Sequence, residues 1–371
     1  MGAMCARDCP TEILCEQACV RNSQESKPVE IGALQRFATD PAINNKAQVF
    51  ERGENTKKTI AVVGAGPAGL SCAHRLSVLG HNVTIYEAKN KISGLNEYGI
   101  AAYKATNDIA AKEAQYILDI GGIAVKTNQS LGKDIFLDQL RNEYDAIFLS
   151  PGLAATRKLN IPSEDNNNIV DAVDYIHEIR QVSDKSELLI ADKVLVIGGG
   201  MTAIDIAVQS KLLGAKEVTI AYRRGFSQMG ASEHEQDLAK QHEISFVLWV
   251  SPSKINLQNN QLQSITFERM ELTDEGKLAG TGNFIDIEAD VVFKAIGQIF
   301  NNSAIERQNN SAEITLSSGR IVTDDERRTS VAGVWAGGDC ILTGDNLTVS
   351  AVQDGKVAAI SIDKFLTKAG A

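Results

Sequence analysis

Two glycine-rich segments constrain the fold of this chain more than any other feature of its sequence. Gly-Ala-Gly-Pro-Ala-Gly at 64–69 follows the apolar run 59–63, and Gly-Gly-Gly-Met-Thr-Ala at 198–203 follows the apolar run 194–197. In a strand, turn and helix unit, such glycines permit a tight turn, admit a pyrophosphate and let helix and strand pack closely. Two matches in this context favour two bound dinucleotides over ordinary turns. We therefore predict an α/β fold with two Rossmann-like dinucleotide-binding domains, whose contact residues are Gly64, Gly66, Pro67, Ala68, Gly69, Gly198, Gly199, Gly200, Thr202 and Ala203.

The residue that ends the second strand of each unit indicates which dinucleotide is bound. Glu87 follows Gly64 at about the 20-residue spacing expected of a carboxylate that accepts hydrogen bonds from a ribose diol, which suits FAD. In the second unit Tyr222 takes the place of the acid and is followed by Arg223 and Arg224. Two guanidinium groups without an acid favour the 2′-phosphate of NADPH, although an arginine can also stack on adenine and tolerate NADH.

Composition excludes several classes of protein. A net charge of −10 argues against non-specific binding of nucleic acid, since a polyanion would be repelled. No segment approaches 18 consecutive apolar residues and the N-terminus lacks an apolar signal core, so we expect neither membrane insertion nor secretion. The expected location is the cytoplasm.

Four of the six cysteines lie in the first nineteen residues: Cys5, Cys9, Cys15 and Cys19. In a reducing compartment this clustering favours an iron–sulfur or zinc site over disulfides, with free thiols as the alternative. We expect Cys72 and Cys340 to pack in the core. No Cys-x-x-Cys separates the two nucleotide units, which disfavours a redox disulfide of the thioredoxin-reductase type.

The order of these motifs predicts an inserted domain. We expect a cysteine-bearing helical segment at 1–57, the first part of an FAD-binding domain at 58–157, an NAD(P)H-binding domain at 158–287, and the second FAD-binding part at 288–371. Alternating runs at 261–267 and 283–287 predict an antiparallel layer in the inserted domain, and the run 290–297 is expected to lead back to the FAD domain.

Further flavin contacts are expected where other strands end. Gly152 follows the strand at 146–150 and can let the chain pass the flavin closely. Asp339 follows the short strand 334–336. A helix is expected to start near Thr348 and Val349, with its N-terminal donors facing the pyrimidine edge of the flavin.

Several stretches resemble the flavoprotein subunits of bacterial NAD-dependent dihydropyrimidine dehydrogenases and, more broadly, the glutamate synthase small-subunit family. The resemblance covers nearly the whole chain and is carried by residues 5–11, 14–16, 19–20, 31–37, 94–100, 221–224 and 337–340. It implies cofactor contacts at Gly94, Leu95, Gly338 and Asp339, the aspartate hydrogen-bonding the ribityl or pyrophosphate part of FAD. It also implies that Cys9, Cys15, Cys19 and Gln35 are ligands of [4Fe-4S] clusters. Gln35 favours the pyrimidine branch, because glutamate synthase small subunits usually differ there.

Family members carry further cysteines upstream of the matched residues, so the resemblance implies an incomplete cluster site in this chain. The expected reaction is hydride transfer from the nicotinamide to FAD, which demands no acid–base side chain. Electrons would pass onward to iron–sulfur clusters, where these are complete, or to a partner, an FMN-containing, pyrimidine-reducing subunit. The alternatives are a glutamate synthase or another ferredoxin-linked reductase as the electron-accepting partner, and a non-catalytic FAD-binding scaffold.

Overall fold

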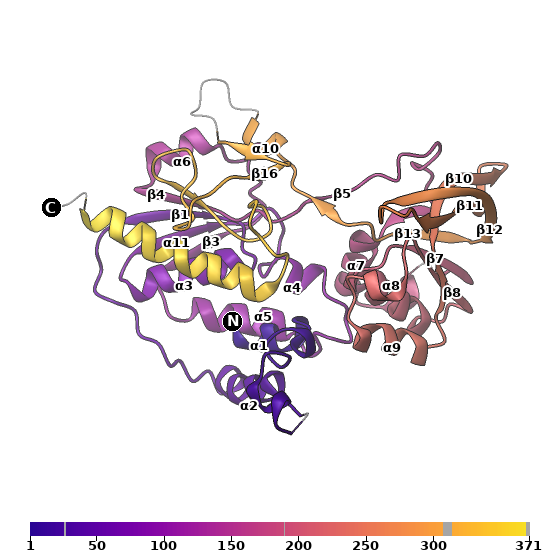
Figure 1. Cartoon of the computed structure of the whole chain (residues 1–371). Coiled ribbons are helices and arrows are strands. Elements are labelled where there is room, and N and C mark those ends of the chain that lie inside the picture. The colour runs from indigo at the N-terminus through magenta and orange to yellow at the C-terminus, as the bar shows by residue number, and fades with distance from the viewer. Residues whose placement is uncertain (26, 189, 307–313, 369–371) are drawn as a thin grey trace. The chain divides into compact units, whose positions relative to one another are not determined.

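The computed structural model describes residues 1–25, 27–188, 190–306 and 314–368, which form two compact units (Figure 1). The first unit consists of Met1–Tyr98, Lys104–Ala155 and Ile299–Ala371. The second consists of Gly99–Tyr103 and Thr156–Gln298. Each unit contains one of the two glycine-rich segments, so the mixed α/β fold with two Rossmann-like units is confirmed.

Five parallel strands form the main sheet of the first unit, in the order β17-β4-β1-β2-β3. They are β1 (Thr59–Val63), β2 (Asn82–Tyr86), β3 (Ile123–Lys126), β4 (Ala146–Leu149) and β17 (Val334–Ala336). The central strands are nearly all apolar, because both faces of the sheet are covered. Their carboxyl ends meet at one edge, which is where ligands bind in open α/β sheets.

Helices cover both faces of this sheet. On one face lie α3 (Pro67–Val78), α5 (Ile109–Leu118) and the long C-terminal α11 (Thr348–Lys368), with α3 and α11 side by side (Figure 1). The other face is covered by α6 (Leu137–Glu143) and by residues 314–341, which include the hairpin β15 (Leu316–Ser317) and β16 (Arg320–Ile321). Two short helices, α4 (Leu95–Tyr98) and α10 (Ser303–Glu306), complete the unit.

The cysteine-bearing segment is helical, as predicted. It contains α1 (Gly2–Asp8), two 3₁₀ turns at Thr11–Ile13 and Val20–Ser23, and α2 (Ile31–Asn44). Glu113 of α5 attaches α1 to the first unit, because its carboxylate accepts the N–H groups of Ala3 at 2.8 Å and Met4 at 3.2 Å.

The second unit repeats the parallel arrangement, with strand order β6-β13-β7-β8-β9. Its strands are β6 (Ile169–Asp171), β7 (Lys193–Ile197), β8 (Glu217–Tyr222), β9 (Ser245–Leu248) and β13 (Val291–Lys294). The helices α7 (Ala172–Gln181), α8 (Met201–Leu212) and α9 (Glu233–Gln241) pack on one face. On the other lies the predicted antiparallel layer of β10 (Val250–Gln258), β11 (Gln261–Leu272) and β12 (Leu278–Glu288), in which Ile265 pairs with Ile287.

Two details of the chain's course differ from the expected boundaries. Strand β13 pairs with β6 and β7, so it belongs to the second unit, and the chain returns to the first unit after Gln298 instead of at 287. Residues 99–103 also belong to the second unit, because the Tyr103 hydroxyl donates to Asp205 at 2.7 Å and the Ala102 N–H donates to Gln209 at 3.0 Å. Burial and the Asp205 carboxylate raise the pKa of Tyr103. The short strands β5 (Ala155–Thr156) and β14 (Gln298–Ile299) pair where the chain passes between the units.

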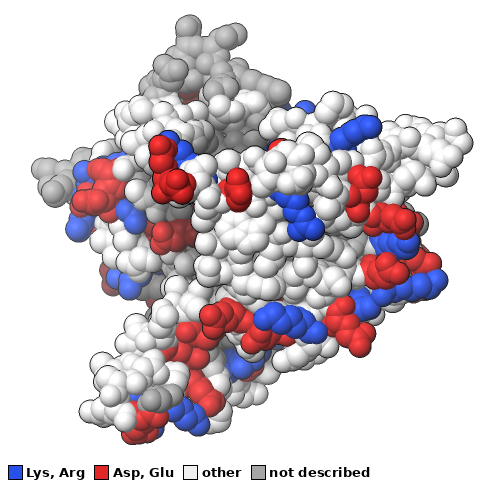
Figure 2. All heavy atoms as spheres, turned by 45° about the vertical axis from the view of Figure 1, so that its right-hand side comes forward, with Lys and Arg blue, Asp and Glu red and all other residues white. Residues whose placement is uncertain are grey.

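Surface properties are unremarkable on the side shown in Figure 2, where Lys and Arg side chains are interspersed with Asp and Glu and form no continuous basic patch. Among the residues with described positions, no helix has the length and apolar character needed to cross a membrane.

Candidate functional site

The first glycine-rich turn lies between β1 and α3 and can be formed only by glycine at its first position. Gly64 has φ +98°, and a Cβ there would lie 2.2 Å from the Ser150 carbonyl oxygen. Gly66 differs, since it has φ −74° and a Cβ would meet only the Cα of Gly94, at 3.8 Å. Gly66 therefore faces open space at the start of α3, where backbone N–H groups and the helix dipole favour an anion.

Glu87 lies beside this turn, immediately after β2. Its carboxylate is buried and accepts the Ala65 N–H at 2.8 Å and the Lys89 N–H at 2.9 Å. Both bonds fix the turn. Each carboxylate oxygen has a second lone pair, so Glu87 keeps acceptor capacity for a ribose hydroxyl.

A second turn, at 337–339, comes close to the first. Gly338 has φ +78°, and a Cβ there would lie 3.1 Å from the Cβ of Ala68 in the first turn of α3. Burial raises the pKa of the neighbouring Asp339 carboxyl, while Arg320 acts in the opposite direction. No hydrogen bond to the Asp339 carboxylate is found within the described ranges. Asp339 is half-buried, so the oxygens of its carboxylate remain available as hydrogen-bond acceptors for a ligand.

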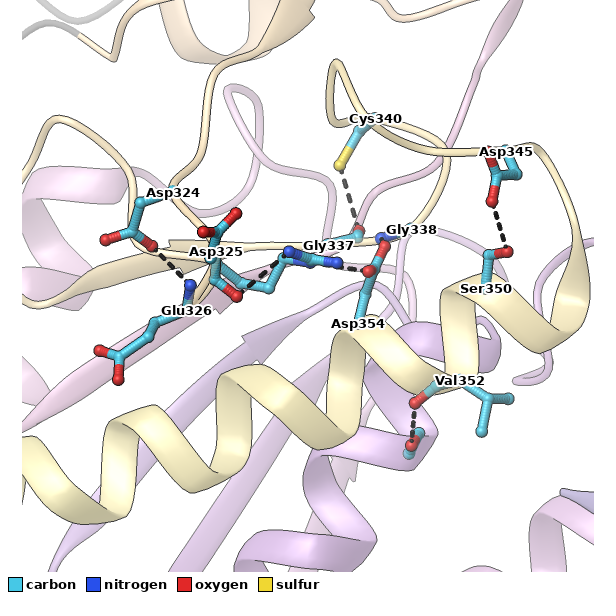
Figure 3. Close-up of polar contacts among 12 residues, drawn as sticks. Asp324, Asp325, Glu326, Gly337, Gly338, Cys340, Asp345, Ser350, Val352 and Asp354 are labelled. Carbon is cyan, nitrogen blue, oxygen red and sulfur yellow. Dashed lines mark hydrogen bonds and ion pairs between the residues drawn. The ribbon is translucent and has the colours of Figure 1, made fainter.

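The turn at 337–339 is supported by a residue that sequence reasoning missed. Asp354 of α11 is 4% exposed and accepts the Gly338 N–H at 2.9 Å (Figure 3). Its other oxygen accepts the Nε–H of Arg327 at 2.7 Å. The signal in the sequence was periodicity, since Asp354 stands three residues after Ala351 and four before Ala358, both buried.

The remaining predicted flavin contacts lie on the same unit. Gly94 approaches Gly66 so closely that a Cβ on Gly94 would be 2.8 Å from the Cα of Gly66, and Leu95 begins α4 directly after it. Gly152 has φ +68°, and a Cβ there would meet no atom within 4 Å.

The start of α11 is contacted by the cysteine-bearing segment. The Thr348 hydroxyl donates to Asp8 at 2.5 Å, and the Val349 N–H donates to the sulfur of Cys9. The predicted N-terminal donors are thus partly used within the chain.

The four N-terminal cysteines do not gather into one site. A hydrogen bond from the Cys5 thiol lowers the pKa of Cys9, and the N–H groups of Val29 and Arg21 lower the pKa of Cys19. Cys15 is exposed. Across the described residues no three His, Cys, Asp or Glu side chains lie close enough to hold a metal ion. The ligand set of Cys9, Cys15, Cys19 and the half-buried Gln35 therefore stays a prediction. Cys72 and Cys340 are fully buried, as expected.

The second unit carries a glycine-rich turn of the same form between β7 and α8. Gly198 meets the Ala295 carbonyl oxygen, where a Cβ would lie at 2.2 Å, while a Cβ on Gly200 would meet nothing within 4 Å. The ring of Tyr222 packs against Gly199, and its hydroxyl donates to the Gln228 carbonyl at 2.6 Å. Thr202 and Ala203 lie in the first turn of α8.

Arg223 and Arg224 follow β8 directly, at the carboxyl edge of the second sheet. Arg223 is exposed and Arg224 half-buried. Neither guanidinium has a hydrogen bond or ion pair with any residue that the structure describes. Both are therefore available to an anionic ligand.

Comparisons with known proteins agree with this geometry. Residues 58–355 match the family described as pyridine nucleotide-disulphide oxidoreductase, and residues 1–47 match the family described as dihydropyrimidine dehydrogenase domain II, 4Fe-4S cluster. The NAD-dependent dihydropyrimidine dehydrogenase subunit PreT homolog of Salmonella typhi is 32% identical over 369 residues, which cover 100% of this chain and 83% of that protein. The glutamate synthase (NADPH) small chain of Escherichia coli K12 is 31% identical over 386 residues, covering 98% of this chain and 80% of the relative.

Solved structures share the fold. Mycobacterium tuberculosis FprA in complex with NADPH superposes with a TM-score of 0.69 at 20% identity, covering 84% of this chain and 85% of FprA. Thioredoxin reductase from T. acidophilum gives a TM-score of 0.64 at 19% identity, over 83% of this chain and 98% of the reductase. The fold, the glycine-rich turns and the relatives show that the chain is an NAD(P)H-dependent flavoprotein oxidoreductase, in the group that contains the dihydropyrimidine dehydrogenase PreT subunits and the glutamate synthase small chains. The chain belongs to the family of pyridine nucleotide-disulphide oxidoreductases.

Proposed function

We propose that this chain is the electron-input subunit of a dihydropyrimidine dehydrogenase, with FAD held by the first unit and a nicotinamide dinucleotide by the second. One observation carries the FAD assignment. The turn at 337–339 lies so close to the start of α3 that a Cβ on Gly338 would be 3.1 Å from the Cβ of Ala68. The carboxylate of Asp339, next to Gly338, accepts no hydrogen bond from any residue that the structure describes, although Arg320 acts on its charge.

The residues of the first unit fit FAD. Gly66 leaves room for a pyrophosphate at the N-terminus of α3, Glu87 keeps lone pairs for the adenosine ribose, and Asp339 offers an acceptor to the ribityl hydroxyls. Bound FAD supplies the acceptor for the hydride of the nicotinamide and the donor for onward electron transfer. The chain's own residues then need only hold and orient the two cofactors and exclude water.

The second unit favours NADPH. The turn that would hold the pyrophosphate contains Gly198, Gly199 and Gly200. After the second strand of this fold, where residues contact the ribose of the adenosine, stand Arg223 and Arg224. Two guanidinium groups without partners match a 2′-phosphate. We therefore expect NADPH to be the better donor, even though the PreT relatives are named as NAD-dependent.

A complete [4Fe-4S] site does not fit the described residues, because they bring no three ligands together. Cys9 and Cys19 accept hydrogen bonds from backbone N–H groups, an environment that suits thiolates. Because no three ligands lie together in the described ranges, a cluster would need further ligands from elsewhere.

The partner is proposed from the relatives. Gln35 favours an FMN-containing, pyrimidine-reducing subunit, which fits the PreT name. The second candidate is the large subunit of a glutamate synthase, because the small chain of that enzyme has nearly the same identity and its name specifies NADPH.

The test is purification of the chain from its source cell, flavin chromatography after heat release, and an anaerobic assay of dye reduction by NADPH and NADH. FAD and nucleotide-dependent dye reduction are expected. Recovery of FMN alone would contradict the assignment of the first unit, and bound FAD without dye reduction would favour a scaffold. A co-purifying FMN protein supports the pyrimidine branch, whereas an amidotransferase subunit supports the second candidate.

A further inference from the structure

A buried carboxylate on the C-terminal helix lies behind the turn that carries Asp339. Asp354 is 4% exposed, and its two oxygens reach in different directions (Figure 3). One accepts the Gly338 N–H at 2.9 Å and the other accepts the Nε–H of Arg327 at 2.7 Å. The helix is thus linked both to the turn and to the loop that precedes β17.

The ion pair with Arg327 explains how the buried carboxylate of Asp354 can stay charged. The side chain of Asp354 is 6% exposed and that of Arg327 is 21% exposed. An unpaired buried carboxylate would be strongly unfavourable, whereas a paired and hydrogen-bonded one is tolerated. Arg327 is itself fixed, because its carbonyl oxygen accepts the Ala336 N–H at 3.0 Å.

The turn is shaped around Asp354. A Cβ on Gly337 would lie 2.8 Å from the Cβ of Asp354, so the backbone at this position touches the aspartate directly. Gly338 has φ +78°, a backbone conformation that residues with a side chain rarely adopt, and its N–H donates to the Asp354 carboxylate. Any movement of Asp354 therefore changes the direction in which the next residue, Asp339, presents its carboxylate.

We propose that Asp354 is a positioning residue for the cofactor: paired with Arg327 and accepting the Gly338 N–H, it fixes the turn that presents Asp339 to the ribityl hydroxyls of FAD. This inference rests on the proposed function. Asp354 does not touch the cofactor site itself, and it acts through Gly338.

The charge of Asp354 has a second effect on Asp339. Burial raises the pKa of the Asp339 carboxyl, Arg320 lowers it, and Asp354 raises it further. An ionised Asp339 is the better acceptor for hydroxyl groups. FAD affinity should then be full above the raised pKa of Asp339 and fall as the pH decreases through it.

The test uses the full chain and compares Asp354→Asn with Asp363→Asn. Asp363 is a matched control on the same helix, since its carboxylate lies 3.0 Å from Nε2 of the buried His81 but is remote from the turn. The dissociation constant of FAD is measured by flavin fluorescence, and that of NADPH in parallel. Asp354→Asn should raise the Kd of FAD roughly tenfold, as for one weakened charge-assisted hydrogen bond, and leave that of NADPH within about twofold. Asp363→Asn should change neither.

Two further measurements separate positioning from general destabilisation. The midpoint pH of FAD release should shift to lower values in Asp354→Asn, because the charge that raises the pKa of Asp339 is removed. Arg327→Lys, which keeps the charge but loses the Nε donor, should weaken FAD binding in the same direction and serves if Asp354→Asn does not fold. An unchanged Kd, an unchanged midpoint, or an equal effect of Asp363→Asn would overturn the proposal. Failure of the unaltered chain to bind FAD would instead refute the proposed function.

Discussion

Replacing Gly66 by alanine should separate cofactor binding from folding. Gly66 adopts φ −74° and ψ −174°, which an alanine accepts, and the nearest atom to an added Cβ is the Cα of Gly94 at 3.8 Å. The protein itself therefore tolerates the methyl group. Fewer conformations in the unfolded chain should raise the free energy of unfolding of the apoprotein by about 0.4–1 kcal/mol.

FAD binding should respond in the opposite direction. The methyl group would occupy the space through which the turn approaches the pyrophosphate. Displacing one charge-assisted hydrogen bond costs about 1.5–3 kcal/mol, or roughly a 10- to 150-fold increase in Kd. Gly69→Ala is the contrasting variant, because its Cβ would lie 1.9 Å from the Gly64 carbonyl oxygen and should destabilise the apoprotein.

The assays are urea unfolding of the apoprotein and fluorescence titration with FAD. If Gly66→Ala binds FAD as tightly as the unaltered chain, the pyrophosphate does not lie against Gly66 and the site is misplaced. Loss of apoprotein stability in this variant would refute the geometric reasoning instead.

Nucleotide preference, pH-dependent stability and cluster assembly can each be tested separately. Arg223→Ala should lower the preference of kcat/KM for NADPH over NADH by roughly 5- to 30-fold, which is about 1–2 kcal/mol after allowance for exposure. The control Lys216→Ala, at the opposite end of β8, should leave this preference unchanged. Equal use of both nucleotides by the unaltered chain would show that the arginines contact the adenosine without selecting for the 2′-phosphate. Burial raises the pKa of Glu113 above its ordinary value of 4.5, so the folded chain holds this proton more tightly than the unfolded chain. The free energy of unfolding should therefore decrease as the pH rises from the ordinary to the raised pKa. Glu113→Gln should flatten this pH dependence, as measured by urea unfolding at several pH values. Anaerobic reconstitution of the chain alone should give less iron and sulfide than one [4Fe-4S] cluster requires, whereas a full complement would contradict the ligand separation seen in the structure.

The sequence predicted the strands and turns whose patterns are local. The run 59–63 coincides with β1 and 334–336 with β17, because apolar strands followed by glycine leave little choice of structure. The start of α11 at Thr348 was also predicted. Strand β13 was placed in the wrong unit, since a short apolar run does not reveal which sheet it joins.

What the sequence did not reveal depends on distant contacts. Asp354 is 16 residues from its partner Gly338 and 27 from Arg327, so no local motif marks the network. The attachment of Tyr103 to Asp205 joins residues 102 positions apart. Local spacing also suggested that the cysteines form one group, whereas the fold directs Cys9 to α11 and Cys19 to Val29.

The proposed function requires one chain to bind FAD and a nicotinamide dinucleotide and to pass hydride between them. Rapid anaerobic mixing of the FAD-loaded chain with NADPH, followed by the flavin absorbance, tests it most directly. We expect the oxidised flavin band to disappear at a rate that saturates with NADPH and is slowed by Arg223→Ala. Bound FAD that stays oxidised in the presence of both NADPH and NADH would contradict it.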